Sequence, residues 1–216
     1  MNIIELPASA KPFVVGLGGT TRAASTTDRA LNLVLAAAEE AGARTRTFDG
    51  PYLAGLPLYR PDSRERSPEA EEFLDAIRLA DGLIVATPSY HAAVSGLVKN
   101  ALDYLEDLRD DWRPYLEGRA VGCVVTAAGW QACGTTLTSL RSIVHALRGW
   151  PTPLGVTLNT SERPLDPADP ANAATLALAT VGYQVVEFVR GQGRVTNPGP
   201  GPQLPTGRTA CETRLP

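Results

Sequence analysis

PFVVGLGGTTRAASTTDRALNLVLAAAEEAG, residues Pro12–Gly42, joins three patterns in one continuous stretch. An apolar run that starts at Phe13 and ends in glycines is typical of a short strand buried on both faces of a sheet. A hydroxyl-rich turn follows, and apolar residues then recur at Leu31, Val34 and Leu35 with the period of a helix. The stretch therefore predicts a strand, a tight turn and a helix, in that order.

The same alternation of strand and helix continues along the chain. The further predicted strands are ARTRTFDG (43–50), GLIVATP (82–88), RAVGCVVTAAG (119–129) and TPLGVTLN (152–159), and the further predicted helices start near Pro68, Ser95, Thr135 and Ala171. Parallel neighbours need crossover connections of a dozen or more residues. This order therefore favours a doubly wound α/β sandwich of three layers.

One globular domain accounts for most of the chain. With 216 residues, of which 44% are hydrophobic, the sequence can bury a single substantial core, and we expect it over residues 1–190. Residues 191–216 are rich in proline and glycine and lack apolar periodicity, which predicts a disordered tail. Residues 50–67, between the second strand and the second helix, are rich in Pro, Gly and Tyr and predict a surface loop.

Composition argues against several functional classes. The net charge is −3 and no basic run is present, so nucleic acid is not an expected partner. The three cysteines form no CxxC pair and only two histidines are available, so we expect neither a metal site nor a disulfide framework. No segment has the length of a membrane span and the N-terminus lacks a secretory pattern, which favours a cytoplasmic protein without a membrane partner.

Ligands of doubly wound sheets bind outside the carboxyl ends of the strands. The first loop at this edge, residues 18–25, could hold a phosphate. The hydroxyls of Thr20, Ser25 and Thr27 surround a predicted helix N-terminus, where amide groups and the helix dipole attract anions, and Arg22 adds a positive charge. Ordinary N-capping by Ser25 or Thr26, with Arg22 solvated, is an equally good explanation. The nucleotide P-loop and the dinucleotide fingerprint are both absent, so a phosphomonoester is favoured.

The other two loops at this edge, residues 87–95 and 126–134, could accept an aromatic ring. Pro88 restricts the backbone, Tyr90 offers a flat surface, and His91 lies among main-chain groups that could bond the polar edge of a heterocycle. The alternative is that Tyr90 covers the core and His91 is an ordinary surface residue. In the third loop, Trp130 could equally cover a ring or lie at a subunit contact.

The first two loops resemble those of the NAD(P)H-dependent FMN reductases, a family of flavodoxin-like proteins. The family motifs are Gly-Ser-x-Arg-x-x-Ser-x-Asn and Thr-Pro-x-Tyr-x-x-Ser-x-x-Gly-x-Leu-Lys-Asn-Ala-x-Asp. In the first loop Gly19, Arg22 and Ser25 match, and Thr20 and Thr27 stand in place of Ser and Asn. In the second loop the matching residues are Thr87, Pro88, Tyr90, Gly96, Lys99, Asn100, Ala101 and Asp103. The likeness runs over residues 12–190 and implies a flavodoxin-like sandwich with a five-stranded parallel sheet in the order 2-1-3-4-5.

The resemblance also implies where a flavin would bind. The FMN phosphate would be held by Thr20, Arg22, Ser25 and Thr27. The isoalloxazine ring would be lined by Pro88, Ser89, Tyr90, His91 and Ala92, with Ala128 and Gly129 at its other edge. No catalytic side chain is expected, because a flavin carries the redox chemistry itself. Homodimers or homotetramers are implied, with the helix after the second loop at the interface.

The implied activity is hydride transfer from NADPH or NADH to FMN, after which reduced flavin would leave to supply a flavin-dependent monooxygenase. An alternative enzyme would retain FMN and reduce quinones, azo dyes, nitro compounds or chromate. A third possibility is an electron-transfer flavodoxin without enzymatic activity, but such carriers tend to be strongly acidic and the net charge here is only −3. No loop has a dedicated basic site for a 2′-phosphate, so both nicotinamides remain candidates.

Overall fold

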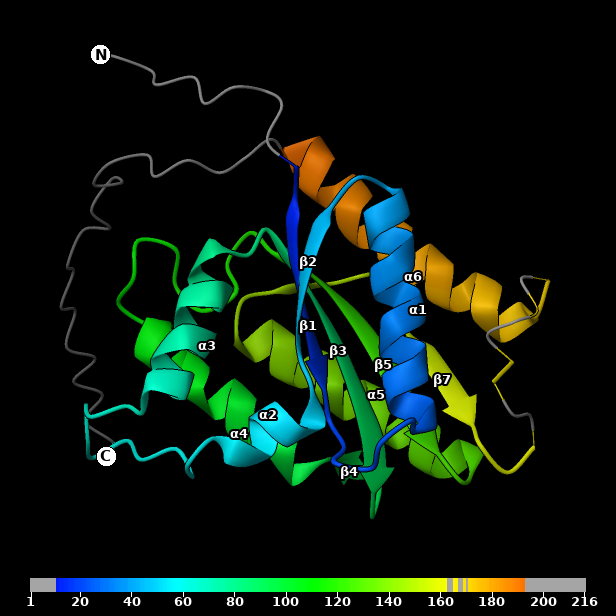
Figure 1. Cartoon of the computed structure of the whole chain (residues 1–216), viewed down its shortest axis with the longest axis horizontal. Coiled ribbons are helices and arrows are strands. Elements are labelled where there is room, and N and C mark those ends of the chain that lie inside the picture. Colours follow the sequence, from blue (N-terminus) through cyan, green and yellow to red (C-terminus); the bar gives the residue numbers. More distant parts are fainter. Residues whose placement is uncertain (1–10, 163–164, 167–168, 170, 193–216) are drawn as a thin grey trace, which may run out of the picture.

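The computed structural model describes residues 11–162, 165–166, 169 and 171–192 (Figure 1). The strands are β1 (Phe13–Gly18), β2 (Arg44–Phe48), β3 (Gly82–Tyr90), β4 (Ala93–Val94), β5 (Ala120–Ala127), β6 (Trp150–Pro151) and β7 (Val156–Asn159). The helices are α1 (Thr26–Glu40), α2 (Gly50–Gly55), α3 (Pro68–Leu79), α4 (Gly96–Asp103), the 3-10 helix η1 (Tyr104–Leu108), α5 (Trp130–Ala146) and α6 (Ala173–Gln192). Residues 1–10 of the expected domain and residues 193–216 of the expected tail lie outside the described residues.

The described strands form one sheet with the path β2-β1-β3-β5-β6, in which these neighbours pair in parallel. The expected strand order is confirmed, because β6 and β7 both pair with β5 and together take the place of the fifth strand. The expected number of five strands is wrong, because the sheet has seven. Two more residues separate Trp150 from Val156 than separate their partners Ala120 and Val124, and this bulge divides the fifth strand.

Helices cover both faces of the sheet and give the predicted three layers (Figure 1). One core includes Leu31 and Val34 of α1 with Val181 and Val185 of α6, and the other includes Phe73 of α3, Val98 of α4 and Leu140 of α5. Ile84 and Val85, adjacent in β3, belong to different cores. This alternation is the pattern of a strand whose two faces are both buried, as its continuous apolar sequence predicts.

Local capping signals set where several helices begin. The hydroxyls of Ser25, Ser67 and Ser95 each accept a hydrogen bond from the amide three residues on, at the starts of α1, α3 and α4. The predicted surface loop 50–67 is wrong in its first part, where α2 forms. The Asp49 carboxylate caps this short helix by accepting from the Tyr52 amide at 2.9 Å.

Candidate ligand-binding site

The loops after β1 and β3 meet at the carboxyl edge of the sheet. The amide of Gly19 donates to the carbonyl of Ala86 at 2.9 Å, which ties the first loop to β3. A Cβ atom at Gly19 would lie 2.9 Å from the Ser95 hydroxyl and 2.8 Å from Val98, so the first loop also touches the start of α4. The fold therefore brings these two loops together, as their positions in a doubly wound sheet predict.

The first loop presents a cation to solvent. The Arg22 side chain is exposed, and its guanidinium forms no hydrogen bond or ion pair within the described part of the chain. Its backbone amide donates to the hydroxyl of Thr20 at 3.2 Å, and Thr20 is buried. Arg22 is thus available to an anion that approaches this loop from solvent.

Ser25 begins α1 as part of a capping box. Its hydroxyl accepts from the Asp28 amide at 3.0 Å, while the Asp28 carboxylate accepts from the Ser25 amide at 3.4 Å. The capping explanation for this serine is therefore correct. It does not compete with anion binding, because the cap uses Ser25 as an acceptor and leaves its hydroxyl proton free to donate.

Thr27 faces the sheet and not the solvent. It is only 2% exposed, and its hydroxyl lies 2.7 Å from the hydroxyl of Thr126 at the end of β5. This buried pair ties the start of α1 to the strand that leads into the third loop. Thr27 therefore links the first loop to the third, a role that its neighbours in the sequence do not indicate.

Gly50 supports the first loop from behind. It is buried at the start of α2, and a Cβ atom at this position would lie 1.6 Å from the carbonyl oxygen of Thr20 and 2.8 Å from the amide nitrogen of Thr21. Real Cβ atoms do not approach backbone atoms so closely, so only glycine fits beside this loop. Sequence reasoning placed Gly50 in a surface loop and missed this contact.

The second loop is a two-residue β-hairpin that joins β3 to β4. Ser89 pairs with Val94 and Tyr90 pairs with Ala93 in antiparallel register. The turn residues His91 and Ala92 have φ angles of 54° and 60°, the left-handed conformation that a type I′ turn requires at both positions. Neither residue is glycine, so the turn carries local backbone strain at the edge where the ligand is expected.

Replacing Ala92 with glycine is expected to stabilise the protein. A left-handed alanine costs roughly 1–2 kcal/mol, so removing its Cβ should raise the free energy of unfolding by about 1 kcal/mol and the melting temperature by about 2–4 °C. Thermal unfolding measures this. The matched control is Ala93→Gly in β4, which removes a Cβ without relieving strain and should lower stability instead. A fall in stability for both variants would contradict the strain at Ala92.

The side chains of the second loop point in different directions. The Ser89 hydroxyl lies 2.7 Å from that of Thr136 and 3.4 Å from the carbonyl of Ala132, so Ser89 faces α5. Tyr90 is 55% exposed, so it does not cover the core. The buried Thr87 hydroxyl donates to the Pro88 carbonyl and accepts from the Ser95 amide, and these bonds fix both ends of the hairpin.

The third loop is shorter than predicted because α5 begins at Trp130. Gly129 is the N-cap residue and no side chain caps it, so the amide groups of the first turn of α5 have no side-chain acceptor at the cap. Ala128 is exposed beside it. The Trp130 indole nitrogen donates to the Glu162 carboxylate at 2.7 Å, a partner that the sequence alone did not indicate.

Other residues of the second motif have structural partners. The Asn100 amide donates to the Pro57 carbonyl at 2.9 Å and accepts from the Tyr59 amide at 2.9 Å, which holds the connection between α2 and α3 against α4. Lys99 and Asp103 form an exposed ion pair one turn apart at 2.5 Å. These three residues therefore organise the helix that follows the candidate site.

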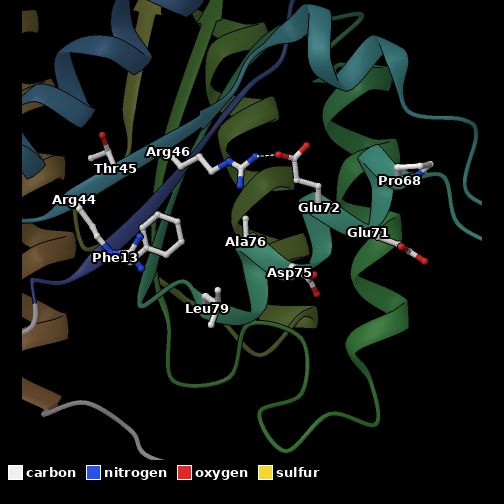
Figure 2. A pocket seen from close by; sticks show the side chains of 10 residues that line it. All are labelled: Phe13, Arg44, Thr45, Arg46, Pro68, Glu71, Glu72, Asp75, Ala76 and Leu79. Carbon is white, nitrogen blue, oxygen red and sulfur yellow. Dashed lines mark hydrogen bonds and ion pairs between the residues drawn. The ribbon is translucent and has the colours of Figure 1, made fainter. Parts of the chain in front are cut away.

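A cavity of about 660 Å³ lies away from the three loops (Figure 2). It is bordered by β1, β2 and α3, and Arg46 of β2 forms an ion pair with Glu72 of α3 there. Phe13 and Arg44, which also line it, are the first residues of their strands. The cavity therefore reaches the amino ends of β1 and β2, whereas the candidate site lies beyond the carboxyl ends of the strands.

The described residues contain neither a thiolate at neutral pH nor a cluster of metal ligands. Burial raises the pKa of Cys133 above its usual value and that of Cys123 to about 12, so both thiols stay protonated at neutral pH. No group of His, Cys, Asp and Glu in the described residues could hold a metal ion. None of the helices in those ranges has the length and apolarity needed to span a bilayer.

Comparison with known proteins links these loops to one family. The family model described as NADPH-dependent FMN reductase matches residues 12–162, which contain all three loops. A 2-hydroxy-1,4-benzoquinone reductase from Burkholderia sp. is 37% identical over 93 residues, which are 42% of this chain and 48% of the relative. An FMN-dependent NADPH-azoreductase from Staphylococcus haemolyticus is 30% identical over 117 residues, 51% of this chain and 58% of the relative. The chain thus spans about half the length of these relatives.

The fold is also shared with solved structures. An oxidoreductase from Corynebacterium diphtheriae superposes with a TM-score of 0.68 at 21% sequence identity, and the match covers 85% of this chain and 99% of that chain. At this identity the likeness concerns the fold alone. Together with the order of the parallel strands, it makes the architecture flavodoxin-like.

Proposed function

Since the chain belongs to the NADPH-dependent FMN reductase family, we propose that it binds FMN at the three-loop site and catalyses transfer of hydride from NADPH or NADH to this flavin. The observation that carries the proposal is the family match over residues 12–162, which includes all three loops of the candidate site. The chemistry of the side chains at that edge is consistent with it.

The first loop fits the phosphate of FMN. A phosphomonoester has three oxygens and a charge approaching −2, so it needs several donors and a cation. Arg22 supplies an exposed guanidinium that forms no hydrogen bond or ion pair with the other described residues, and Thr20 and Ser25 supply hydroxyls. Thr27 acts differently in this proposal, because its hydroxyl is bonded to Thr126 and so positions α1 instead of meeting the phosphate directly.

The second and third loops fit the flavin ring. Pro88 is buried and the hairpin after it has a fixed turn, so the backbone from Ser89 to Ala92 forms a defined edge for a planar heterocycle. Ala128 and Gly129 present little side-chain bulk on the adjacent strand end, where the other edge of the ring would lie.

When bound, FMN supplies the two-electron chemistry, and the chain supplies binding and orientation. The hairpin and the first turn of α5 border the region where the flavin and nicotinamide rings would have to be held in the orientation that hydride transfer requires. The amide groups at the uncapped start of α5 are suitable donors for negative charge that develops on a bound ring. No side-chain acid or base is required in this scheme.

The fate of the electrons defines a second candidate function. In the first candidate function, reduced FMN leaves and supplies a flavin-dependent monooxygenase. In the second, FMN is retained and a quinone or an azo dye is reduced. The second is supported by the names of two relatives, the benzoquinone reductase and the azoreductase. Steady-state kinetics with free FMN and with benzoquinone separate them: ping-pong turnover of a retained flavin, much faster with the quinone, would exclude the first.

The assembly and location of the protein belong to the same proposal. We expect a homodimer or homotetramer in which α4 lies at the interface, which analytical ultracentrifugation would measure. A reducing cytoplasmic location is consistent with the free thiols of Cys123 and Cys133.

Replacing Arg22 with alanine is expected to weaken FMN binding about 10- to 100-fold. A hydrogen bond to a charged group is worth roughly 1.5–3 kcal/mol, and this variant removes such a bond to the phosphate. The loss of flavin fluorescence on binding gives the dissociation constant. Riboflavin, which lacks the phosphate, should bind the variant and the parent equally.

Arg29→Ala is the matched control for this prediction. Arg29 is an exposed arginine on α1 whose guanidinium donates to the Thr26 hydroxyl at 3.3 Å. Its removal should change the FMN dissociation constant by less than about 2-fold. An Arg22→Ala protein that binds FMN as tightly as the parent would exclude the phosphate assignment.

A further inference from the structure

Trp130 is an exposed aromatic side chain whose indole nitrogen is hydrogen-bonded. It is the first residue of α5 and is 54% exposed, yet its indole nitrogen donates to a carboxylate oxygen of Glu162 at 2.7 Å. The other oxygen of Glu162 accepts from the side-chain amide of Asn159 at 2.9 Å. Asn159 is buried at the end of β7, so the indole is anchored to the sheet through Glu162.

The position of Trp130 places it at the edge of the proposed flavin site. It directly follows Ala128 and Gly129 in the chain. The bonds from Ser89 to Thr136 and to the Ala132 carbonyl bring the first turns of α5 against the hairpin that carries Tyr90. Two exposed aromatic side chains, Tyr90 and Trp130, therefore flank the same edge of the sheet.

An exposed indole with a hydrogen-bonded nitrogen is well suited to stack on a planar ring. Its polar atom is already bonded, so ligand binding costs it no hydrogen bond, and the bond to Glu162 restricts the side chain and so reduces the entropy lost on binding. Burying an exposed indole face against a ring also removes apolar surface from water.

We infer that Trp130, oriented by Glu162, is the wall on which a planar aromatic electron acceptor stacks, and that it favours quinones and other flat acceptors over small non-aromatic ones. This inference rests on the proposed function, because it takes FMN in the three-loop site as the electron donor. Trp130 determines acceptor specificity, and Glu162 is a positioning residue that acts through it.

The test measures acceptor binding without turnover. Oxidised FMN has no electrons to give, so a quinone binds the oxidised holoprotein as an unreacting ligand. Equilibrium dialysis with anthraquinone-2-sulfonate gives the dissociation constant. In Trp130→Leu this constant should rise about 3- to 10-fold, while the constant for FMN changes less than 2-fold. The KM for benzoquinone should rise in parallel, and that for ferricyanide should not.

Trp112→Leu is the matched control. Trp112 is 52% exposed but lies in the connection before β5, at the opposite edge of the sheet, so its loss should leave quinone binding unchanged. Glu162→Ala should raise the dissociation constant of the quinone by part of the amount seen in Trp130→Leu. Glu162→Gln, which keeps one acceptor oxygen, should bind the quinone as the parent does. In a background without the other two tryptophans, Glu162→Ala should also lower the fluorescence anisotropy of Trp130.

Each other outcome overturns a specific statement. If Trp130→Leu binds FMN normally and its quinone affinity is unchanged, the stacking role of Trp130 is excluded and the proposed function is not affected. A large loss of FMN affinity in this variant means that Trp130 covers the flavin, and a changed oligomeric state means that it lies at a subunit contact. Failure of the parent protein to bind FMN would exclude the proposed function and this inference together.

Discussion

Gly50→Ala is expected to raise the dissociation constant of FMN about 100-fold and to destabilise the fold. The added Cβ would lie 1.6 Å from the carbonyl oxygen of Thr20, and neither atom can move independently of the backbone. The first loop must therefore shift by more than an ångström, and a misplacement of about 1 Å can cost about 100-fold where function depends on exact positioning. Overpacking of this kind also costs typically 1–3 kcal/mol of stability. Flavin fluorescence titration and chemical unfolding measure the two effects.

Gly55→Ala provides the matched control. It lies at the end of the same short helix, and a Cβ at this position would meet no atom within 4 Å. Its FMN affinity and stability should therefore match those of the parent. If Gly50→Ala bound FMN normally, the contact between α2 and the first loop would not set the geometry of the phosphate site.

Arg119→Met is expected to lower the free energy of unfolding by about 3 kcal/mol or more. Arg119 is only 1% exposed, and its guanidinium donates to the carbonyls of Ala80, Tyr115 and Arg78 at 3.0, 3.0 and 2.9 Å. Two of these carbonyls close the last turn of α3, where a cation is favourable. Methionine leaves the carbonyls of Tyr115 and Arg78 without this donor, whereas that of Ala80 keeps a hydrogen bond from Arg113 at 3.3 Å. Each orphaned buried group costs roughly 1–3 kcal/mol.

The buried cation is tolerated because its hydrogen bonds are made. Burial, together with the neighbouring Arg113, lowers the pKa of Arg119 to about 9, so it remains protonated at neutral pH. The melting temperature of Arg119→Met should fall by about 6–12 °C. Arg119→Lys, which keeps the charge and some donors, should lose less, and Arg109→Met, at an exposed arginine, should lose under about 0.5 kcal/mol. A melting temperature unchanged in Arg119→Met would contradict the capping role.

Much of the architecture follows from local sequence patterns. Buried strands such as β3 are continuous apolar runs, and serines mark the starts of α1, α3 and α4. Right-handed crossovers between parallel strands leave few possible topologies, and among these the order 2-1-3-4-5 was implied by the family resemblance. The same reasoning placed the three loops at one edge, because parallel strands end on the same side.

The sequence was less informative where a backbone departs from a regular pattern. The division of the fifth strand depends on a bulge of two residues opposite β5, and no residue type in TPLGVTLN requires it. The α2 helix is short, so its apolar period is too brief to distinguish it from a loop, and only the Asp49 cap indicates where it starts.

What the sequence by itself determined is therefore the class of fold and the identity of the loops that could hold a ligand, because these depend on periodicity and on local caps, whereas the order of the strands was implied by the resemblance to a known family. What only the tertiary structure decided is the direction of individual side chains. Thr27 meets Thr126, 99 positions away, and Trp130 meets Glu162, 32 positions away. Such contacts depend on how elements pack to within an ångström, which no local pattern in the chain specifies.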